Sequence, residues 1–395
     1  MKYAAITERL AGLGGAKWEV HARAKAMQAA GESVIQLTIG EPDVATPASL
    51  LTEAKRSIDA GRLGYSNGRG EAGLLAALAK RYSARSGRTI SPQQITAFPG
   101  TQTSLYAVLM ALTEAGDEVI IGDPMYATYE GLIAASGAVA VPVTLRAEHG
   151  FRMQAEDVAA LVTPRTRVIF LNTPHNPTGA VLRPEDIAAI GEIAKSHDLW
   201  ILSDEVYEEM IFDGSSFASP LDRADLADRV VVAASISKSH AAPGFRSGWC
   251  VGPQEFADRL LPVAETMLFG NQPFIADMTQ LAVSAPSEVA RGMAERFARR
   301  ADLIAARLDG VNGLRVQRPE AGMFTVVDIR ATGLSGEAFA EALLTEQKVA
   351  VMPGESFGAA LAGWIRISLT LEDDVIAQAC ARIAKFAALK QGIAA

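Results

Sequence analysis

A lysine and an arginine follow a strand-like apolar run in the middle of the chain. The segment Ser235–Gly248, SISKSHAAPGFRSG, comes directly after RVVVAA and contains Lys238 and Arg246. Ligands of open α/β sheets bind where strands end. A partly desolvated lysine there has a lowered pKa and acts as a nucleophile. The hydroxyls of Ser235 and Ser237, with the guanidinium, suit a phosphate. The alternative is a solvated surface lysine.

Three further segments place polar residues after strand-like runs. Asn176 lies in LNTPHNPTG, which is typical of a rigid turn. Asp204 and Tyr207 lie in LSDEVY, where the alternatives are a helix cap and a core tyrosine. Gly100 and Thr101 open a helix after a strand, where free N–H groups bind anions, although this could be an ordinary helix start. All four segments are expected at one edge of one sheet.

The elements that must position these residues alternate between short β-branched runs and longer amphipathic ones. This alternation predicts an α/β protein with a mostly parallel sheet sandwiched by helices. Strands are expected at Gln94–Phe98, Glu118–Gly122, Arg167–Leu171, Leu199–Ser203, Arg229–Ala234 and Gly248–Gly252. Helices are expected between them at Thr101–Leu112, Tyr126–Ser136 and Pro184–His197.

After residue 252 the pattern changes to that of a smaller α+β domain. It consists of one long charged helix, two strands and a closing helix, expected at Ser287–Leu308, Met323–Asp328, Trp364–Ser368 and Glu372–Leu389. The first 45 residues have few strand signals and are expected to join this domain. We therefore expect a large domain over residues 46–286 and a small domain made of residues 1–45 plus 287–395.

Composition excludes several other classes. In 395 residues, 37 Lys+Arg against 45 Asp+Glu give a net charge of −8, which disfavours nucleic-acid binding. Two cysteines, Cys250 and Cys380, make no disulfide framework and fit a reducing cytoplasm. The His and Cys residues show no zinc-ligand spacing, so no metal is expected. No apolar run approaches the roughly 18 residues of a membrane span, and no secretory signal is evident.

A GxGxxG pattern at Gly68, Gly70 and Gly73 does not indicate a dinucleotide site. Such a site needs a buried strand before it and an acidic residue about 20 positions later. Here GRLGYSN precedes the pattern, and residues 91–94 contain no acid. We interpret it as a glycine-rich loop.

Taken together, the motifs resemble those of class I aminotransferases in the fold-type-I pyridoxal-phosphate superfamily. They run in family order over essentially the whole chain: GEPD (Gly40–Asp43), PGTQ (Pro99–Gln102), DPMYATY (Asp123–Tyr129), NTPHNPTG, SDEVY, SxSK with GFRSG, and WIRIS (Trp364–Ser368). The resemblance implies amino-group transfer from an L-amino acid to a 2-oxo acid by a ping-pong cycle. It also implies a homodimer with shared active sites.

The resemblance further implies roles for individual residues. Lys238 matches the Schiff-base lysine, and Asp204 the carboxylate that pairs with the pyridine nitrogen and keeps the ring an electron sink. Tyr207 and Asn176 match the pair that hydrogen-bonds the ring hydroxyl, and Asn176 also borders the substrate. The remaining cofactor contacts would be Gly100, Thr101, Gln102, Ser235, Ser237 and Arg246 around the phosphate, Tyr126 on the ring face, and Tyr65 from the neighbouring subunit.

The substrate contacts implied by the resemblance are Arg366, which clamps the α-carboxylate, and the backbone of Gly40. Classical aspartate aminotransferases carry a second arginine in about the region of Ala264–Pro273, and some bacterial ones a lysine at the position of Thr101. This chain has neither. A dedicated dicarboxylate enzyme is therefore disfavoured.

Several segments, with His240 after Ser239, look most like the arginine–pyruvate transaminase branch. We expect neutral or basic donors, arginine among them, and pyruvate or 2-oxoglutarate as acceptor. Alternatives are a β-lyase or synthase of the same fold, or an aspartate or aromatic aminotransferase. A cofactor-binding regulator is disfavoured, because it needs a DNA-binding domain ahead of the loop at Gly40.

Overall fold

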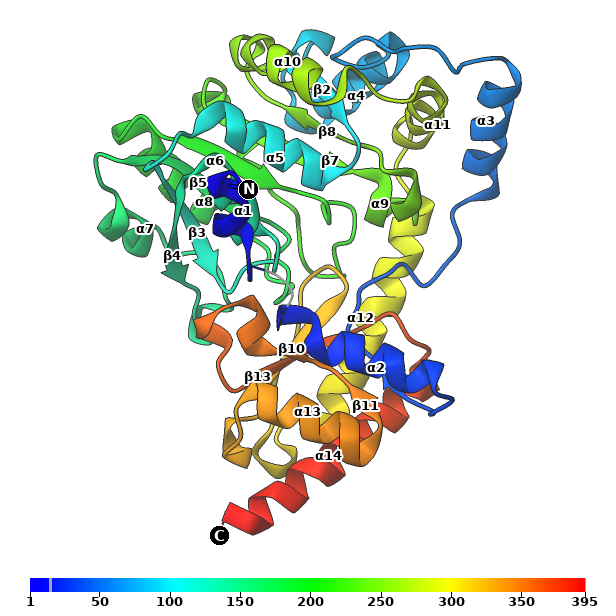
Figure 1. Cartoon of the computed structure of the whole chain (residues 1–395), viewed down its shortest axis with the longest axis vertical. Helices are drawn as coiled ribbons and strands as arrows, with labels where there is room; N and C mark the ends of the chain where they lie inside the picture. The colour runs from blue at the N-terminus through cyan, green and yellow to red at the C-terminus, as the bar shows by residue number, and fades with distance from the viewer. Residues whose placement is uncertain (14–15, 395) are drawn as a thin grey trace.

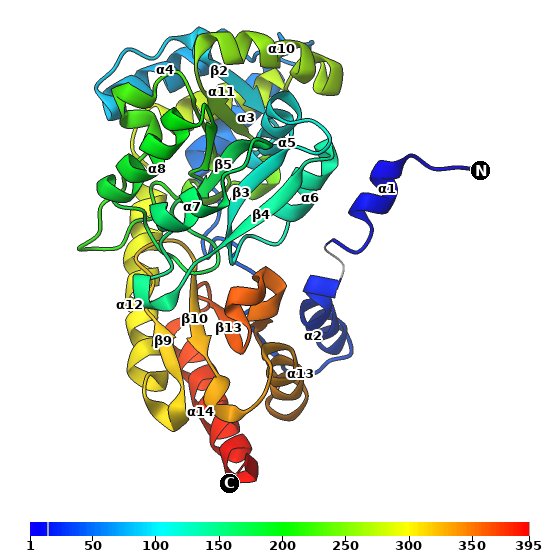
Figure 2. The same cartoon turned by 90° about the vertical axis from the view of Figure 1, so that its left-hand side faces the viewer.

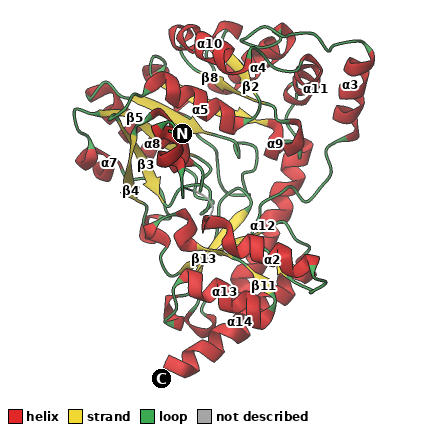
Figure 3. Cartoon of the chain, viewed as in Figure 1, coloured by secondary structure: helices red, strands yellow, loops and turns green. Residues whose placement is uncertain are grey.

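A seven-stranded sheet carries the four segments expected to meet at one sheet edge (Figures 1 and 3). The structure is a computed structural model that describes residues 1–13 and 16–394. The strand order is β2 (Ile95–Phe98), β8 (Gly248–Val251), β7 (Val230–Ser235), β6 (Trp200–Asp204), β5 (Thr166–Asn172), β3 (Glu118–Asp123) and β4 (Val139–Thr144). Of the seven strands, β8 alone runs opposite to the other six, so the mostly parallel sheet is confirmed.

Successive residues of the central strands pack into two separate cores, one on each face of the sheet. On one face lie α5 (Thr101–Leu112), α6 (Tyr129–Ser136) and α10 (Gln254–Leu268), where Val231 and Phe170 are buried. On the other lie α3 (Ala48–Asp59), α4 (Ala72–Ser86), α7 (Ala155–Leu161), α8 (Pro184–Ser196) and α11 (Pro273–Val283), where Val230 and Ile169 are buried. Burial on both faces explains why these strands read as continuous apolar runs.

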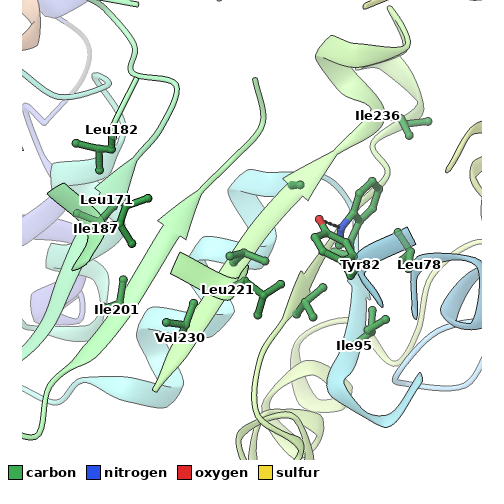
Figure 4. Packing of buried hydrophobic residues seen from close by; sticks show 14 of the residues in the cluster. Leu78, Tyr82, Ile95, Leu171, Leu182, Ile187, Ile201, Leu221, Val230 and Ile236 are labelled. Carbon is green, nitrogen blue, oxygen red and sulfur yellow. Dashed lines mark hydrogen bonds between the residues drawn. The ribbon is translucent and has the colours of Figure 1, made fainter. Parts of the chain in front are cut away.

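Figure 4 shows part of the second core. Tyr82 of α4 is fully buried there, and its hydroxyl accepts a hydrogen bond from Trp249 Nε1 at 2.8 Å. The two polar atoms therefore satisfy each other inside an apolar layer.

The edge strand β4 is not predicted by the sequence. Its run VAVPVT contains Pro142, and most of its side chains are partly or fully exposed. Proline is tolerated on an edge strand because one side of the strand has no ladder partner. β4 pairs only with β3.

The second part of the chain is built on a four-stranded antiparallel sheet. Its order is β12 (Met352–Pro353), β13 (Trp364–Ser368), β10 (Phe324–Asp328) and β9 (Arg315–Gln317). The helices α12 (Glu288–Leu308), α13 (Gly336–Gln347) and α14 (Asp373–Ala394) cover it around a third core that includes Phe297, Phe339 and Phe386. The predicted long helix and both predicted strands are therefore present.

α12 spans the two parts, as the long yellow helix of Figure 1 shows. Ser287 caps it by accepting a hydrogen bond from Ala290 N, which explains the start at Glu288. Each part has its own sheet, but the cores cross the boundary, because Met210 packs into the third core and Trp364 into the second. The division into residues 46–286 and 1–45 plus 287–395 stays a proposal. The described N-terminal residues divide further. α2 (Glu19–Ala29) packs against α13 of the small part (Figure 2), whereas Arg9 of α1 (Ala5–Leu10) donates to Ala134 O of α6 at 3.0 Å.

Within residues 1–13 and 16–394, the structure has no helix that is both long and apolar enough to cross a membrane.

Candidate active site

One pocket of about 260 Å³ lies where the central strands end and face the small antiparallel sheet. All predicted site residues line it except Gly100 and Tyr65. Among the described residues it is also lined by residues that the sequence does not single out: Trp18, Ile39, Leu105, Tyr129, Asn172, Val206, Pro243 and Phe324.

Lys238 lies in α9 (Ile236–Ser239), the single helical turn that follows β7. Its Nζ donates a hydrogen bond to the carbonyl of Gly40 at 2.7 Å. Burial lowers the pKa of Lys238 to about 8, an effect that Glu41 opposes and Arg366 reinforces. A large fraction of the amine is therefore neutral near pH 8, and the neutral amine is the nucleophilic form.

Asp204 is the last residue of β6 and is almost completely buried. Its Oδ2 accepts a hydrogen bond from the hydroxyl of Tyr129 at 2.8 Å, and its Oδ1 accepts one from Val206 N at 3.1 Å. Burial raises the pKa of Asp204 to about 6, against both hydrogen bonds. A cation placed beside this carboxylate would stabilise its charged form.

Tyr129 is a site residue that sequence reasoning missed. It lies inside the motif DPMYATY, but the motif does not say which tyrosine reaches the site. The structure places Tyr126 and Tyr129 edge to face, with ring centroids 5.6 Å apart, and both line the pocket. Only Tyr129 bonds to Asp204.

Arg366 is a buried cation in β13, with only 1% of its surface exposed. Nη2 donates to Thr38 O at 2.6 Å and Nη1 to Asn176 Oδ1 at 3.1 Å. The guanidinium lies over the rings of Phe324 and Phe357, 3.8 and 4.3 Å from their centroids.

No acidic group in the described part of the chain pairs with Arg366, and its Nε has no hydrogen-bond partner there. Burial lowers the pKa of Arg366 to about 9. A buried charge without a counter-ion is costly, so the geometry is that of a site that receives an anion.

A second anion site lies at the start of α5. Gly100 has φ +88°, and a Cβ there would overlap the guanidinium of Arg246. The hydroxyl oxygen of Thr101 is buried and has no partner among the described residues. Arg246 Nη1 donates to Ser237 Oγ at 3.5 Å, and Ser235 Oγ accepts from Ser237 N at 3.3 Å.

This cradle of three hydroxyl groups, an arginine and helix N–H groups fits a phosphate, and among the hydroxyls Thr101 Oγ1 has no partner in the described residues. Tyr126 and Asp204 line the same pocket, so an aromatic face and a carboxylate are both available to a flat, cationic ring. The residues present therefore fit pyridoxal phosphate.

Tyr65 does not lie in this pocket. Its side chain is 93% exposed, and its ring packs edge to face on Phe269 with centroids 5.2 Å apart. A role for Tyr65 in the site of its own chain is excluded by this placement.

Comparison with known proteins assigns the family. The family model "Aminotransferase class I and II" matches residues 32–383, so the chain belongs to this family. It is 46% identical to the arginine–pyruvate transaminase AruH of Pseudomonas aeruginosa, over 98% of each chain. It is 36% identical to the aspartate/prephenate aminotransferase of Cereibacter sphaeroides, over 93% of this chain and 94% of that one.

The fold is likewise similar to that of a solved aspartate aminotransferase. The structure of a double mutant of the Thermus thermophilus enzyme superposes with a TM-score of 0.91 at 29% identity, over 98% of this chain and all of that one. The expected fold type I architecture is confirmed. The chain is an aminotransferase that uses pyridoxal phosphate and moves an amino group between an amino acid and a 2-oxo acid. The lyase and synthase alternatives are not favoured.

Proposed function

We propose that the enzyme takes the α-amino group of a basic or neutral amino acid, arginine among them, and passes it to pyruvate. The observation that carries the binding of an amino acid is Arg366, the buried cation without a counter-ion among the described residues, which suits the α-carboxylate that all amino acids share. The choice of donor is supported by two other observations. No second arginine is present in Ala264–Pro273 to bind a side-chain carboxylate. The similarity to an arginine–pyruvate transaminase supports the same choice of substrates.

In this proposal Arg366 sets the position of the substrate. Its two η nitrogens are fixed by Thr38 and Asn176, so its planar guanidinium can offer a bidentate face to a carboxylate. Gly40 lies beside it in the same pocket. The α-carbon then lies within reach of Lys238, whose Nζ is already held at the carbonyl of Gly40.

Lys238 acts in this proposal as the group that attaches the cofactor and then moves the proton. Pyridoxal phosphate, when bound, supplies the electron sink that accepts the charge left at the α-carbon. The neutral Nζ would take the α-proton of the donor and give up a proton again within the same half-reaction, so that it ends neutral. In the second half of the cycle the transfers run in reverse, and Nζ would deliver a proton to the α-carbon of the new amino acid. A pKa of about 8 suits both directions of this transfer near neutral pH.

The other site residues hold the cofactor. Asp204 would keep the ring nitrogen protonated, with Tyr129 fixing its carboxylate. Tyr207 and Asn176 would bind the ring hydroxyl, and Tyr126 would pack on the ring face. The phosphate would be held by Gly100, Thr101, Gln102, Ser235, Ser237 and Arg246.

We also propose a cytoplasmic homodimer in which Tyr65 reaches the site of the partner chain. Tyr65 and Phe269 are exposed apolar side chains in contact with each other, and Leu63, two residues before Tyr65, is exposed as well. Contact with a second copy would bury these side chains. The two free, buried cysteines fit a reducing compartment.

The donor assignment is tested with half-reactions. The cofactor-loaded enzyme is mixed with arginine, lysine, leucine, alanine or aspartate, and the change of cofactor absorbance is followed. We expect arginine to give the highest kcat/KM and aspartate a low one. Aspartate reacting far faster than the other donors would overturn the proposal.

A variant separates recognition of the α-carboxylate from recognition of the side chain. Arg366→Lys keeps the charge but loses the bidentate fork, so it should raise KM for every donor by a similar factor. Selective loss of one donor class would mean that Arg366 contacts the side chain.

A further inference from the structure

Trp18 lies in the part of the pocket wall that the roles above leave unused. It lines the pocket together with Ile39, Gly40 and Phe324. This inference rests on the proposed function: with the α-carboxylate on Arg366 and the α-carbon at Lys238, the donor side chain must lie against the remaining wall. The sequence does not single out Trp18, because it belongs to no motif.

Lys17, the residue before Trp18, is bound from two sides. Lys17 Nζ pairs with Glu130 Oε2 of α6 at 3.0 Å, and Ser356 Oγ donates to Lys17 O at 3.0 Å. Glu130 belongs to the large part of the molecule and Ser356 to the small part. The segment that carries Trp18 is thus bound to both parts at the pocket.

The indole is also positioned relative to Arg366. Its ring packs edge to face on His21, with centroids 6.3 Å apart. His21 Nδ1 is 2.8 Å from Thr38 Oγ1, and the carbonyl of Thr38 accepts the hydrogen bond from Arg366 Nη2. A short chain of contacts therefore sets the indole relative to the group that holds the α-carboxylate. Such positioning is what a side-chain subsite requires.

The chemistry of this wall favours a cation. An indole face attracts guanidinium and ammonium groups through its quadrupole, and tryptophan is the strongest aromatic in this respect. Glu41 is exposed directly after Gly40, and its charge acts on Lys238 in the pocket. Within the described residues its carboxylate has no salt-bridge partner.

We propose that Trp18 determines donor specificity: its indole face contacts the donor side chain, and together with the Glu41 carboxylate it favours a guanidinium- or ammonium-bearing donor. The carboxylate adds a long-range attraction, whereas the indole supplies the contact area along the methylene chain.

The test compares arginine with norleucine, whose side chain is similarly extended but uncharged. Trp18→Leu should lower kcat/KM for arginine about tenfold, which corresponds to about 1.4 kcal/mol, and for norleucine by a clearly smaller factor. Trp18→Phe should recover most of the loss, because phenylalanine keeps an aromatic face. Glu41→Gln should lower the rate with arginine and leave norleucine less affected.

A matched control is Trp200→Leu. Trp200 packs on Phe256 outside the pocket, with ring centroids 5.5 Å apart, so this variant should keep the donor preference of the wild type. The cofactor absorbance and the unfolding midpoint of each variant show whether it is folded and loaded.

A binding measurement adds a readout without turnover. The 2-hydroxy analogue of arginine has no amino group to transfer, and its Kd by calorimetry should rise about tenfold in Trp18→Leu. Equal losses of kcat/KM for arginine and norleucine in Trp18→Leu would overturn the preference for a cationic donor. Unchanged kcat/KM and Kd would overturn the contact between Trp18 and the donor side chain. The two proposals can fail separately. If wild-type enzyme does not accept arginine, but Trp18→Leu still lowers kcat/KM for lysine more than for norleucine, the assignment of arginine as donor is wrong and the inference about Trp18 stands.

Discussion

At the residue scale, burial moves the pKa values of the two central groups toward each other. The pKa of Lys238 falls to about 8 and that of Asp204 rises to about 6, each because its charged form is desolvated. Between these values Asp204 is largely ionised while a growing share of Lys238 is neutral. Both forms are those that the proposed chemistry needs.

Lys238 predicts a pH dependence for cofactor attachment. The neutral amine is the reactive form, so the rate at which apoenzyme gains the long-wavelength absorbance of bound cofactor should rise with pH and level off above about 8. Stopped-flow absorbance measures this rate. Lys238→Ala should bind the cofactor without that absorbance, and a rate profile centred near the ordinary lysine value would contradict the assignment.

The hydrogen bond from Tyr129 to Asp204 predicts a shift in the acid limb of the pH–rate profile of the half-reaction. Its hydrogen bond lowers the pKa of Asp204, so Tyr129→Phe should raise that pKa further and move the acid limb of the half-reaction to higher pH. Asp204→Asn should lose about a thousandfold or more in rate at all pH values, which is about 4 kcal/mol of transition-state stabilisation. If Tyr129→Phe lowers the rate uniformly with no shift of the limb, its bond to Asp204 is not the cause.

At the scale of elements, an ion-pair cluster fixes the loop that carries Gly40 to the long helix α12. Arg300 of α12 is buried and pairs with Asp43 at 2.7 Å, and Arg296 pairs with the same carboxylate at 2.8 Å. Although burial opposes it, these two guanidinium groups hold the pKa of Asp43 below its usual value. The site loop and the helix between the two parts are therefore one connected unit.

Asp43→Asn predicts a loss of stability together with weaker substrate binding. Removing the buried carboxylate leaves Arg300 only the more exposed partners Asp373 at 3.0 Å and Glu372, which should lower the free energy of unfolding by about 3 kcal/mol. KM should rise, because the loop with Gly40 and Glu41 is less fixed. Denaturant unfolding and steady-state kinetics measure the two effects.

The control is Glu372→Gln, which removes an exposed partner of Arg300 at 3.3 Å and should change stability by well under about 1 kcal/mol. The stabilisation by Asp43 exists above the pKa of the unfolded carboxyl, near 4, and is lost as pH falls through the lower folded value. If Asp43→Asn were as stable as wild type at pH 7, the stabilising role of the Asp43–Arg300 pair would be contradicted.

The difference between buried and exposed elements explains which parts of the fold the sequence could predict. The strands β5 to β8 and the helix α5 were predictable because fully buried strands and amphipathic helices follow local patterns. The residues at their ends were predictable because strand ends meet at one edge of the sheet. β4 was missed because an edge strand with Pro142 and exposed side chains lacks that pattern.

The missed site residues depend on contacts between distant segments. Thr38 reaches Arg366 across 328 positions of sequence, and Tyr129 reaches Asp204 across 75. No local pattern marks either threonine or tyrosine for such a contact. Trp18 becomes part of the pocket only when the small part packs against α6.

At the scale of the whole molecule, the described chain leaves an apolar surface exposed beside the glycine-rich loop. Tyr65 is 93% exposed, and Phe269 and Leu63 are each 63% exposed. Gly270 approaches the backbone of Ser66 so closely that a Cβ there would clash, so the two loops carrying these residues are tightly packed. A fixed apolar surface of this kind suits a symmetric contact with a second copy.

A mixed-dimer experiment tests the proposed sharing of sites. Lys238→Ala should be inactive, and Tyr65→Ala should bind cofactor weakly because the partner's phosphate loses a contact. In a mixed dimer, the site on the Tyr65→Ala chain has its own Lys238 and takes Tyr65 from the other chain, so it is intact. Random reassortment of equal amounts makes about half of the dimers mixed, with one intact site each, so activity should recover to about a quarter of wild type. Activity at low cofactor concentration, before and after reassortment, measures the recovery.

If Tyr65 served its own chain, every site would lack one of the two residues and reassortment would restore nothing. A fully active monomer in dilute ultracentrifugation would exclude shared sites altogether.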